Sequence, residues 1–128
     1  MRAFLAIKYY PNFQNKELIE DITNIFKQVD IDVFVFVRDV QAFGTYKFDS
    51  HELMEKAFAE IDKSDIFIID ASEPSIGIGI EAGYAYMKGI PIYLIANKNT
   101  KVSDTIKGIA NDHVFYNELD DILKLKIN

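Results

Sequence analysis

Short apolar runs alternate with amphipathic segments along the chain. The runs have the length and the β-branched content of buried strands, and they cover residues 2–8, 32–37, 65–70, 92–96 and 113–116. Between the runs, apolar residues recur at helical spacing. This alternation predicts an α/β fold with a single doubly wound, mainly parallel five-stranded sheet and helices on both faces, of the flavodoxin-like or Rossmann-like kind.

The connecting segments indicate where the first two helices begin. Asn15 is the expected N-cap of the first helix, and Asp49 with Glu52 three residues later is a variant of the capping box for the second. The first buried stripe consists of Leu18, Ile22, Ile25, Phe26 and Val29. The second consists of Leu53, Ala57, Phe58 and Ile61. Between these two helices, the polar and aromatic residues 38–48 form the longest predicted loop.

The second half of the chain predicts further helices. A helix from about 77 to 88 would end at Gly89, because glycine tolerates the left-handed conformation that closes many helices. A short helix is expected near 103–109, and a last helix begins at Asn117. No repeat, low-complexity tract or linker divides the chain, so we expect a single domain over residues 1–128.

Composition and charge exclude several classes of protein. The chain has 128 residues, 49% of them apolar, with a net charge of −6 and no basic cluster. This charge argues against nucleic-acid polymers or anionic membranes as partners. The absence of cysteine excludes disulfides and thiol catalysis, and it agrees with a cytoplasmic location. The apolar start of the chain is too short for a signal peptide or a membrane span, and Lys8 interrupts it.

The segment 65–89 carries the strongest functional signal. A buried strand leads through a short polar loop into a glycine-containing helix start, and helix N-termini attract anions. Ser75, Gly77 and Gly79 are therefore candidate ligands of a phosphate. Glu81 follows in the first or second turn of the helix, where the helix dipole favours its ionised form. Serine and acidic residues are also common at helix starts for structural reasons alone.

Ligands of a doubly wound sheet bind beyond the carboxyl ends of the strands. This rule places three segments on one rim, residues 8–10, 38–43 and 72–79. Lys8 and Arg38 are the cations expected there, and either can bind a phosphate. Tyr9 can stack on a base, although an aromatic residue at a strand end is also common as a packing residue.

Neither a metal nor a cofactor is predicted. His51 and His113 are isolated and lack the spacing of metal ligands or of a catalytic triad. The glycines at 77, 79 and 83 follow the third strand after a loop, whereas a dinucleotide fingerprint directly follows the first strand. Gly83 lies inside the predicted helix at a cost of about 1 kcal/mol relative to alanine, which predicts close packing against a neighbouring element or a ligand.

One segment resembles the signature of the nucleoside 2-deoxyribosyltransferase superfamily, and its spelling is closest to the 2'-deoxynucleoside 5'-monophosphate N-hydrolase branch: Pro74-Ser-Ile-Gly-Ile-Gly-Ile-Glu-Ala-Gly-Tyr-Ala-Tyr-Met-Lys-Gly-Ile-Pro91. The resemblance implies that Glu81 attacks the anomeric carbon of the sugar, while the serine and glycines of the segment hold the 5' phosphate. It also implies a homodimer or a larger homo-oligomer with shared active sites. Asn111 is the candidate residue that a neighbouring copy contributes.

The chain departs from the family pattern in two places. The first loop, residues 8–11, contains no glycine, although the first loop of the family is usually rich in glycine. The family also carries an aspartate in the helix before the third strand, and Ala57 occupies that position here. Cleavage of a glycosidic bond normally uses two carboxyl groups. Glu60 lies one turn further along the same helix and is the candidate replacement, although a solvated surface charge is an equal reading of this residue.

These features together predict an enzyme that cleaves or transfers the N-glycosidic bond of a small deoxynucleoside or deoxynucleoside 5'-monophosphate. Glu81 would be the nucleophile and Glu60 the second acid, and the deoxyribosyl group would pass to water or to another base. Two alternatives stay open. One is a catalytically weak nucleotide sensor that retains the phosphate loop, and the other is a glycohydrolase of a larger nucleotide such as NAD.

Overall fold

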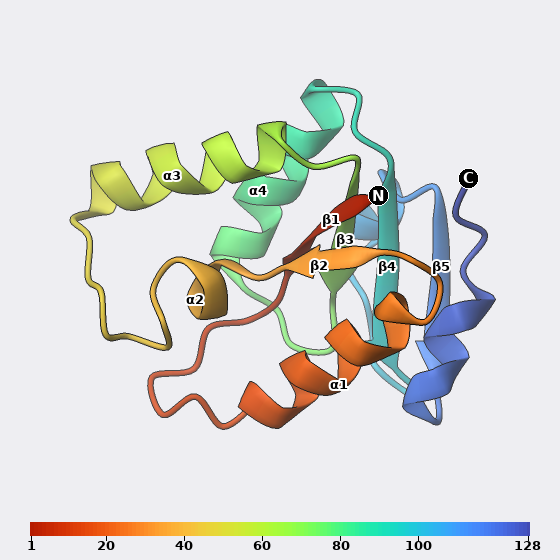
Figure 1. Ribbon diagram of the computed structural model, residues 1–128. Coiled ribbons are helices and arrows are strands. Elements are labelled where there is room, and N and C mark those ends of the chain that lie inside the picture. Colours follow the sequence, from red (N-terminus) through yellow and green to blue (C-terminus); the bar gives the residue numbers. More distant parts are fainter.

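Five parallel strands form one sheet in the computed structural model, which describes residues 1–128 (Figure 1). The strands are β1 (Arg2–Ala6), β2 (Asp32–Phe34), β3 (Ile66–Asp70), β4 (Ile92–Asn97) and β5 (Asp112–Tyr116). Their order across the sheet is β2-β1-β3-β4-β5, and every neighbouring pair is parallel. The structure therefore confirms the predicted α/β fold, with a sheet that is entirely parallel.

Helices cover both faces of this sheet. They are α1 (Lys16–Lys27), α2 (Phe36–Asp39), α3 (Ser50–Asp62), α4 (Ile76–Met87), α5 (Asp104–Lys107) and the 3-10 helix η1 (Leu119–Lys124). One core cluster joins the sheet to α1 and η1 through residues such as Ile22 and Ile122. The other joins the opposite face to α3 and α4 through Ile61, Ile78 and Ala82. Figure 1 shows α3 and α4 together on one side of the strands and α1 on the other.

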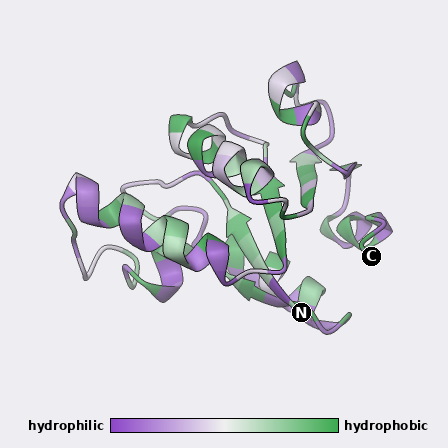
Figure 2. Cartoon of the chain, turned by 90° about the horizontal axis from the view of Figure 1, so that it is seen from above, coloured by the Kyte–Doolittle hydropathy of each residue, from purple (hydrophilic) through white to green (hydrophobic).

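Hydropathy follows these layers. Figure 2 shows the most hydrophobic residues in the strands, whereas α3 carries hydrophilic residues along its outer surface. The strand β3 is buried along its whole length, as expected of a central parallel strand. None of the helices has both the length and the hydropathy that a membrane-spanning helix requires.

The second strand is shorter than predicted. We expected a strand over residues 32–37, but β2 ends at Phe34 and the short helix α2 follows. The Asp39 carboxylate accepts a hydrogen bond from the Val35 backbone N–H at 2.8 Å, and the Arg38 guanidinium donates to the Val33 carbonyl at 2.7 Å. The first bond satisfies a backbone N–H just beyond the strand, and the two bonds together hold the short helix α2 against the end of β2.

The predicted helix ends are confirmed at two positions and corrected at another two. The Asp49 side chain caps α3 by accepting from the Glu52 N–H at 2.8 Å, and Gly89 follows α4 with a positive φ of 73°. Asn15 does not cap α1 with its side chain, because its amide donates to the Lys8 carbonyl at 2.9 Å instead. Val29 lies beyond the end of α1 and is 50% exposed, so it is not part of the buried stripe.

Two predictions about the later helices also need correction. The final segment forms the 3-10 helix η1 rather than an α-helix beginning at Asn117. Close packing was expected around Gly83, but a Cβ atom built on this residue would meet no atom within 4 Å. No other element of the chain therefore requires a glycine at this position of α4.

Candidate active site

A cavity of about 410 Å³ opens beyond the carboxyl ends of β1 and β2, between α3 and α4. Twelve of its sixteen lining residues are hydrophobic: Phe4, Leu5, Ala6, Ile7, Tyr9, Val35, Phe36, Val37, Leu53, Met54, Ala57 and Ile78. The other four are Gln41, Ser75, Gly77 and Glu81. Such a cavity, mostly apolar with a few polar groups that converge on it, is typical of a site for a small molecule.

Glu81 is the one charged residue of this lining. It projects from the second turn of α4, and no side chain or backbone group of the chain forms a hydrogen bond or an ion pair with its carboxyl group. Burial among apolar residues raises the pKa of Glu81 from 4.5 to about 7. A carboxyl group with a perturbed pKa in a cavity is a typical feature of a functional site.

The structure brings several of the predicted site residues together with Glu81. Tyr9, Ser75 and Gly77 line the same cavity, so the loop after β1 meets the start of α4 as the strand-end rule predicts. Ser75 occupies the N-cap position of α4 without forming a capping hydrogen bond, which leaves its hydroxyl group free for a ligand. The Gly77 and Gly79 residues are helical rather than part of the preceding loop, as their places in α4 show.

Gly79 lies on a second and more polar cavity of about 750 Å³. This cavity is lined by the loop before α4 and by residues 100–106, and it shares Ser75 and Ile78 with the first. Ser75 therefore stands between the two hollows, whereas the Gly79 backbone does not line the cavity that contains Glu81.

The two predicted cations lie outside the Glu81 cavity. Lys8 lines a small neighbouring hollow of about 60 Å³, and its Nζ lies 3.8 Å from a carboxylate oxygen of Glu73. The Arg38 guanidinium is fully engaged, because it donates to Asp39, Glu20, Thr23 and the Val33 carbonyl. The expectation that Arg38 holds a phosphate is therefore corrected: this arginine anchors α2 to α1 and β2.

Glu60 and Asn111 lie at the opposite edge of the sheet from the cavity. Glu60 is in the last turn of α3 and forms an ion pair with Arg2, at the amino end of β1. Partial burial acts to raise the pKa of Glu60, but hydrogen bonds from Arg2 and Lys63 outweigh it and hold the pKa below its usual value. Asn111 accepts a hydrogen bond from the Ile92 N–H at 3.0 Å, at the start of β4.

The expectation that Glu60 replaces the family aspartate is consequently corrected. Its position follows from chain order, since the end of a helix that leads into a parallel strand lies at the amino edge of the sheet. Ala57, by contrast, lines the cavity and is only 2% exposed. The α3 side of the cavity thus consists of the apolar side chains of Leu53, Met54 and Ala57, and it contains no second carboxyl group.

Sequence reasoning missed two polar residues of this region. Gln41 lines the cavity from the loop after α2, and the only available signal was its place beyond the end of a strand. Asp70 closes β3 and is 3% exposed; its Oδ1 accepts from the Ser72 N–H at 2.9 Å, while its Oδ2 has no partner. Burial raises the pKa of Asp70. This carboxyl group fixes the turn that leads toward Ser75.

Comparison with known proteins identifies the family. The family model described as nucleoside 2-deoxyribosyltransferase matches residues 3–119. The chain belongs to this family. The segment that resembled the family signature is the one that contributes Ser75, Gly77 and Glu81 to the cavity, so sequence and geometry single out the same residues.

Individual relatives agree with this assignment. A protein of Thermofilum pendens with the provisional name 2'-deoxynucleoside 5'-phosphate N-hydrolase 1 is 27% identical over 78 residues, which are 57% of this chain and 54% of that relative. The match thus spans about half the length of the relative. A CMP N-glycosidase of Clostridium botulinum has a TM-score of 0.71 and 25% identity, over 97% of this chain and 95% of its own.

A 2-deoxyribosyltransferase of Bacillus psychrosaccharolyticus shares the fold, with a TM-score of 0.74 and 18% identity over 99% of this chain and 93% of its own. These names all describe enzymes of the N-glycosidic bond. The fold of the chain is therefore the fold of this group, and the cavity beside Glu81 is its candidate active site.

The unpartnered carboxyl group of Glu81 predicts an unusual pH dependence of stability. Its pKa in the folded chain, about 7, lies above its ordinary value of 4.5, so the folded state keeps the proton longer than the unfolded state. The free energy of unfolding should therefore fall as pH rises from about 4.5 to about 7. The Glu81→Gln variant lacks the titrating carboxyl group and so avoids this loss of stability. Its free energy of unfolding should therefore exceed that of the wild type by an amount that grows with pH to at most about 3 kcal/mol at about pH 8.

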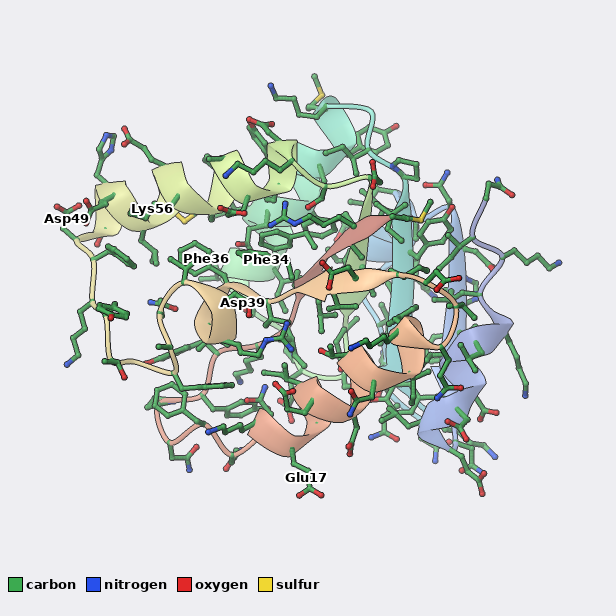
Figure 3. The ribbon with its side chains drawn as sticks, viewed as in Figure 1. Glu17, Phe34, Phe36, Asp39, Asp49 and Lys56 are labelled. Carbon is green, nitrogen blue, oxygen red and sulfur yellow. The ribbon has the colours of Figure 1, made fainter.

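Urea denaturation of both proteins at about pH 4.5 and pH 8 measures this difference. Glu17→Gln is the control, because Glu17 is exposed and Figure 3 shows it pointing away from the molecule. A Glu81→Gln variant with the same pH dependence as the wild type would show that the carboxyl group is well solvated.

Proposed function

We propose that this protein cleaves or transfers the N-glycosidic bond of a deoxynucleoside or deoxynucleoside 5'-monophosphate, with Glu81 as the nucleophile. The observation that carries the proposal is the position of Glu81: it is the one carboxyl group in an apolar cavity, and it has no protein partner. A carboxylate that is poorly solvated and unpaired is reactive toward an electrophilic carbon. The names of the similar proteins describe the same kind of bond.

The reaction has two steps. In the first, a carboxylate oxygen of Glu81 bonds to C1' of the sugar, and the C1'–N bond breaks with its electron pair going to the base. In the second, water or another base attacks C1', and the ester bond breaks to release the Glu81 carboxylate. The proton that an attacking water loses passes to the departed base or to the solvent. The apolar walls exclude bulk water from the glycosyl ester, and the nature of the acceptor decides between hydrolysis and transfer.

The start of α4 is the proposed site for the 5' phosphate. Ser75 and Gly77 lie in the cavity wall, the Ser75 hydroxyl group is free, and the first backbone N–H groups of a 12-residue helix have no partners within the helix. No lysine or arginine lines this cavity, so backbone N–H groups and the serine would carry most of the binding.

A nucleotide sensor is the second candidate, and the Ala57 position favours it. The α3 wall of the cavity carries a methyl group where the family carries an aspartate, so a neutral base receives no proton from this wall. In a sensor, the cavity and the start of α4 bind a nucleotide that Glu81 does not cleave.

We also propose that two copies of the chain associate through α4. Its outer surface exposes Ile76, Ile80 and Met87, at 86%, 50% and 82%, and Gly83 on the same helix has open space beside it. Large apolar side chains in a continuous exposed stripe are typical of an interface. A second copy placed there would pack close to the backbone at Gly83, since that residue has no side chain.

Glu81→Gln should reduce turnover by at least about a hundredfold and leave nucleotide binding largely intact, because a neutral amide cannot form the glycosyl ester. Chromatography of the released base from a panel of deoxynucleosides and their 5'-monophosphates measures the change. Glu60→Gln serves as the matched control, since Glu60 lies at the far edge of the sheet. Turnover at the wild-type rate in Glu81→Gln would refute the mechanism, whereas binding without cleavage in the wild type would establish the sensor.

Deoxynucleoside 5'-monophosphates should bind at least several-fold more tightly than the corresponding deoxynucleosides, because the phosphate meets the N–H groups at the start of α4. Ser75→Ala should reduce this advantage, and Ser50→Ala, at the distant start of α3, should not. Isothermal titration calorimetry measures the affinities. Equal affinities for nucleotide and nucleoside in the wild type would exclude the phosphate site.

Light scattering at micromolar concentration should give about twice the chain mass of 14.7 kDa. Ile80→Glu should shift the protein to the monomer, because it places an unpaired charge at the centre of the proposed interface. Val29→Glu is the control, since Val29 is also 50% exposed but lies beyond the end of α1. A wild-type protein that scatters as a monomer would contradict the assembly.

A further inference from the structure

The side chains that line the cavity carry negative charge at one position and positive charge at none. Glu81 is its one charged side chain, and neither lysine nor arginine is among the residues that line it. The two cations that the sequence placed on this rim are held elsewhere, Lys8 beside Glu73 and Arg38 between Asp39 and Glu20. No cationic side chain of the protein therefore compensates the charge of an ionised Glu81 inside the apolar walls, which leaves that role to a ligand.

Aromatic rings strengthen this preference. Tyr9 and Phe36 line the cavity from the loop after β1 and from α2, whereas the Phe4 ring, also in the lining, is 1% exposed and stacks on Phe67. The negative faces of such rings attract cations, and the attraction is larger where water is excluded. The Tyr9 and Phe36 rings therefore favour a flat cationic ring over a neutral polar base.

The departure of the base from the sugar also favours a positively charged base. A neutral base leaves with the electron pair of the C1'–N bond and needs a proton from an acid, a contribution of about 10²–10⁴-fold in rate. The α3 wall offers only Leu53, Met54 and Ala57. Gln41 and Ser75 are not acids, and Tyr9 is 50% exposed at the mouth of the cavity. A base that carries a permanent positive charge leaves as a neutral molecule and needs no proton.

We infer that the base of the preferred substrate is a positively charged heteroaromatic ring attached to the sugar, either an N7-alkylated purine or a pyridinium. This inference rests on the function proposed above and specifies its substrate class. A carboxylate oxygen of Glu81 bonds to C1', the C1'–N bond breaks, and its electron pair neutralises the ring. Water then attacks C1', the ester bond between C1' and Glu81 breaks, and Glu81 is left as a carboxylate. One proton passes to the solvent.

The ionisation of Glu81 fits this class of substrate. Burial holds the pKa of Glu81 at about 7 in the empty cavity, so much of the protein carries the protonated, unreactive form near neutral pH. A cationic ring placed beside the carboxyl group favours the ionised form. A substrate whose base leaves without an acid is therefore also a substrate that favours the ionised, nucleophilic form of Glu81.

Matched pairs of substrates test the inference. The first pair is 7-methyl-2'-deoxyguanosine 5'-monophosphate and 2'-deoxyguanosine 5'-monophosphate, which differ by the methyl group that fixes the charge. The second is the 2'-deoxy form of nicotinamide mononucleotide and the reduced, uncharged dihydro form of the same deoxynucleotide. Released base is measured by chromatography, and each enzymatic rate is divided by the non-enzymatic rate measured in parallel. Wild type and Glu81→Gln are both assayed.

We expect the cationic member of at least one pair to be accelerated at least about a hundredfold more than its neutral partner, with the acceleration lost in Glu81→Gln. The pair that shows the effect identifies the purinium or the pyridinium as the source of the charge. Acceleration of the neutral member to within tenfold of the cationic one would overturn the inference and leave the proposed function standing. Cleavage of no member of either pair, nor of any nucleotide in the earlier panel, would overturn both.

Discussion

The pairing of β1 with β3 is the constraint on which the cavity depends. The chain leaves β1 toward α1 on one face of the sheet and leaves β3 toward α4 on the opposite face. Because these two strands are neighbours, the loops that follow them separate and open a crevice at their carboxyl ends. The Glu81 cavity lies next to this crevice, beyond the carboxyl ends of β1 and β2, with Ile7 and Tyr9 on one side and Ser75 on the other.

Two glutamates on neighbouring helices show how position within this frame decides chemistry. Glu60 lies at the amino edge of the sheet, where Arg2 and Lys63 pair with it and hold its pKa low. Glu81 lies at the carboxyl edge among apolar residues, where burial raises its pKa to about 7. The residue type is the same, but one carboxylate stabilises the fold and the other opposes it when ionised. Such a cost is typical of residues that are kept for function.

Much of this arrangement was predictable from the chain. The strand and helix pattern, the Asp49 cap and the turn at Gly89 are local features, and the structure confirms them. The engagement of Arg38 was not predictable, since it depends on contacts with residues far from it in sequence, such as Glu20 and Thr23. For the same reason the sequence predicted a free Arg38 that could bind a phosphate.

The error over Glu60 has a different cause. Residues 57 and 60 are one turn apart on the same face of α3, but successive turns of the helix approach different edges of the sheet. Chain order supplies that information: the last turn of a helix that precedes a parallel strand lies at the amino edge, away from any ligand. The same rule places Asn111, just before β5, outside the cavity of its own chain.

Proton and ligand binding at Glu81 are linked through the same cavity. The empty cavity disfavours the ionised carboxyl group, so a ligand that brings positive charge or hydrogen-bond donors to Glu81 must release a proton when it binds below about pH 7. Linkage also requires the reverse: deprotonation of Glu81 tightens the binding of such a ligand and weakens the binding of an anionic group at the same place. A nucleotide can meet both requirements at once. Its phosphate lies at the positive N-terminus of α4, and its positively charged base lies beside the negative carboxylate of Glu81.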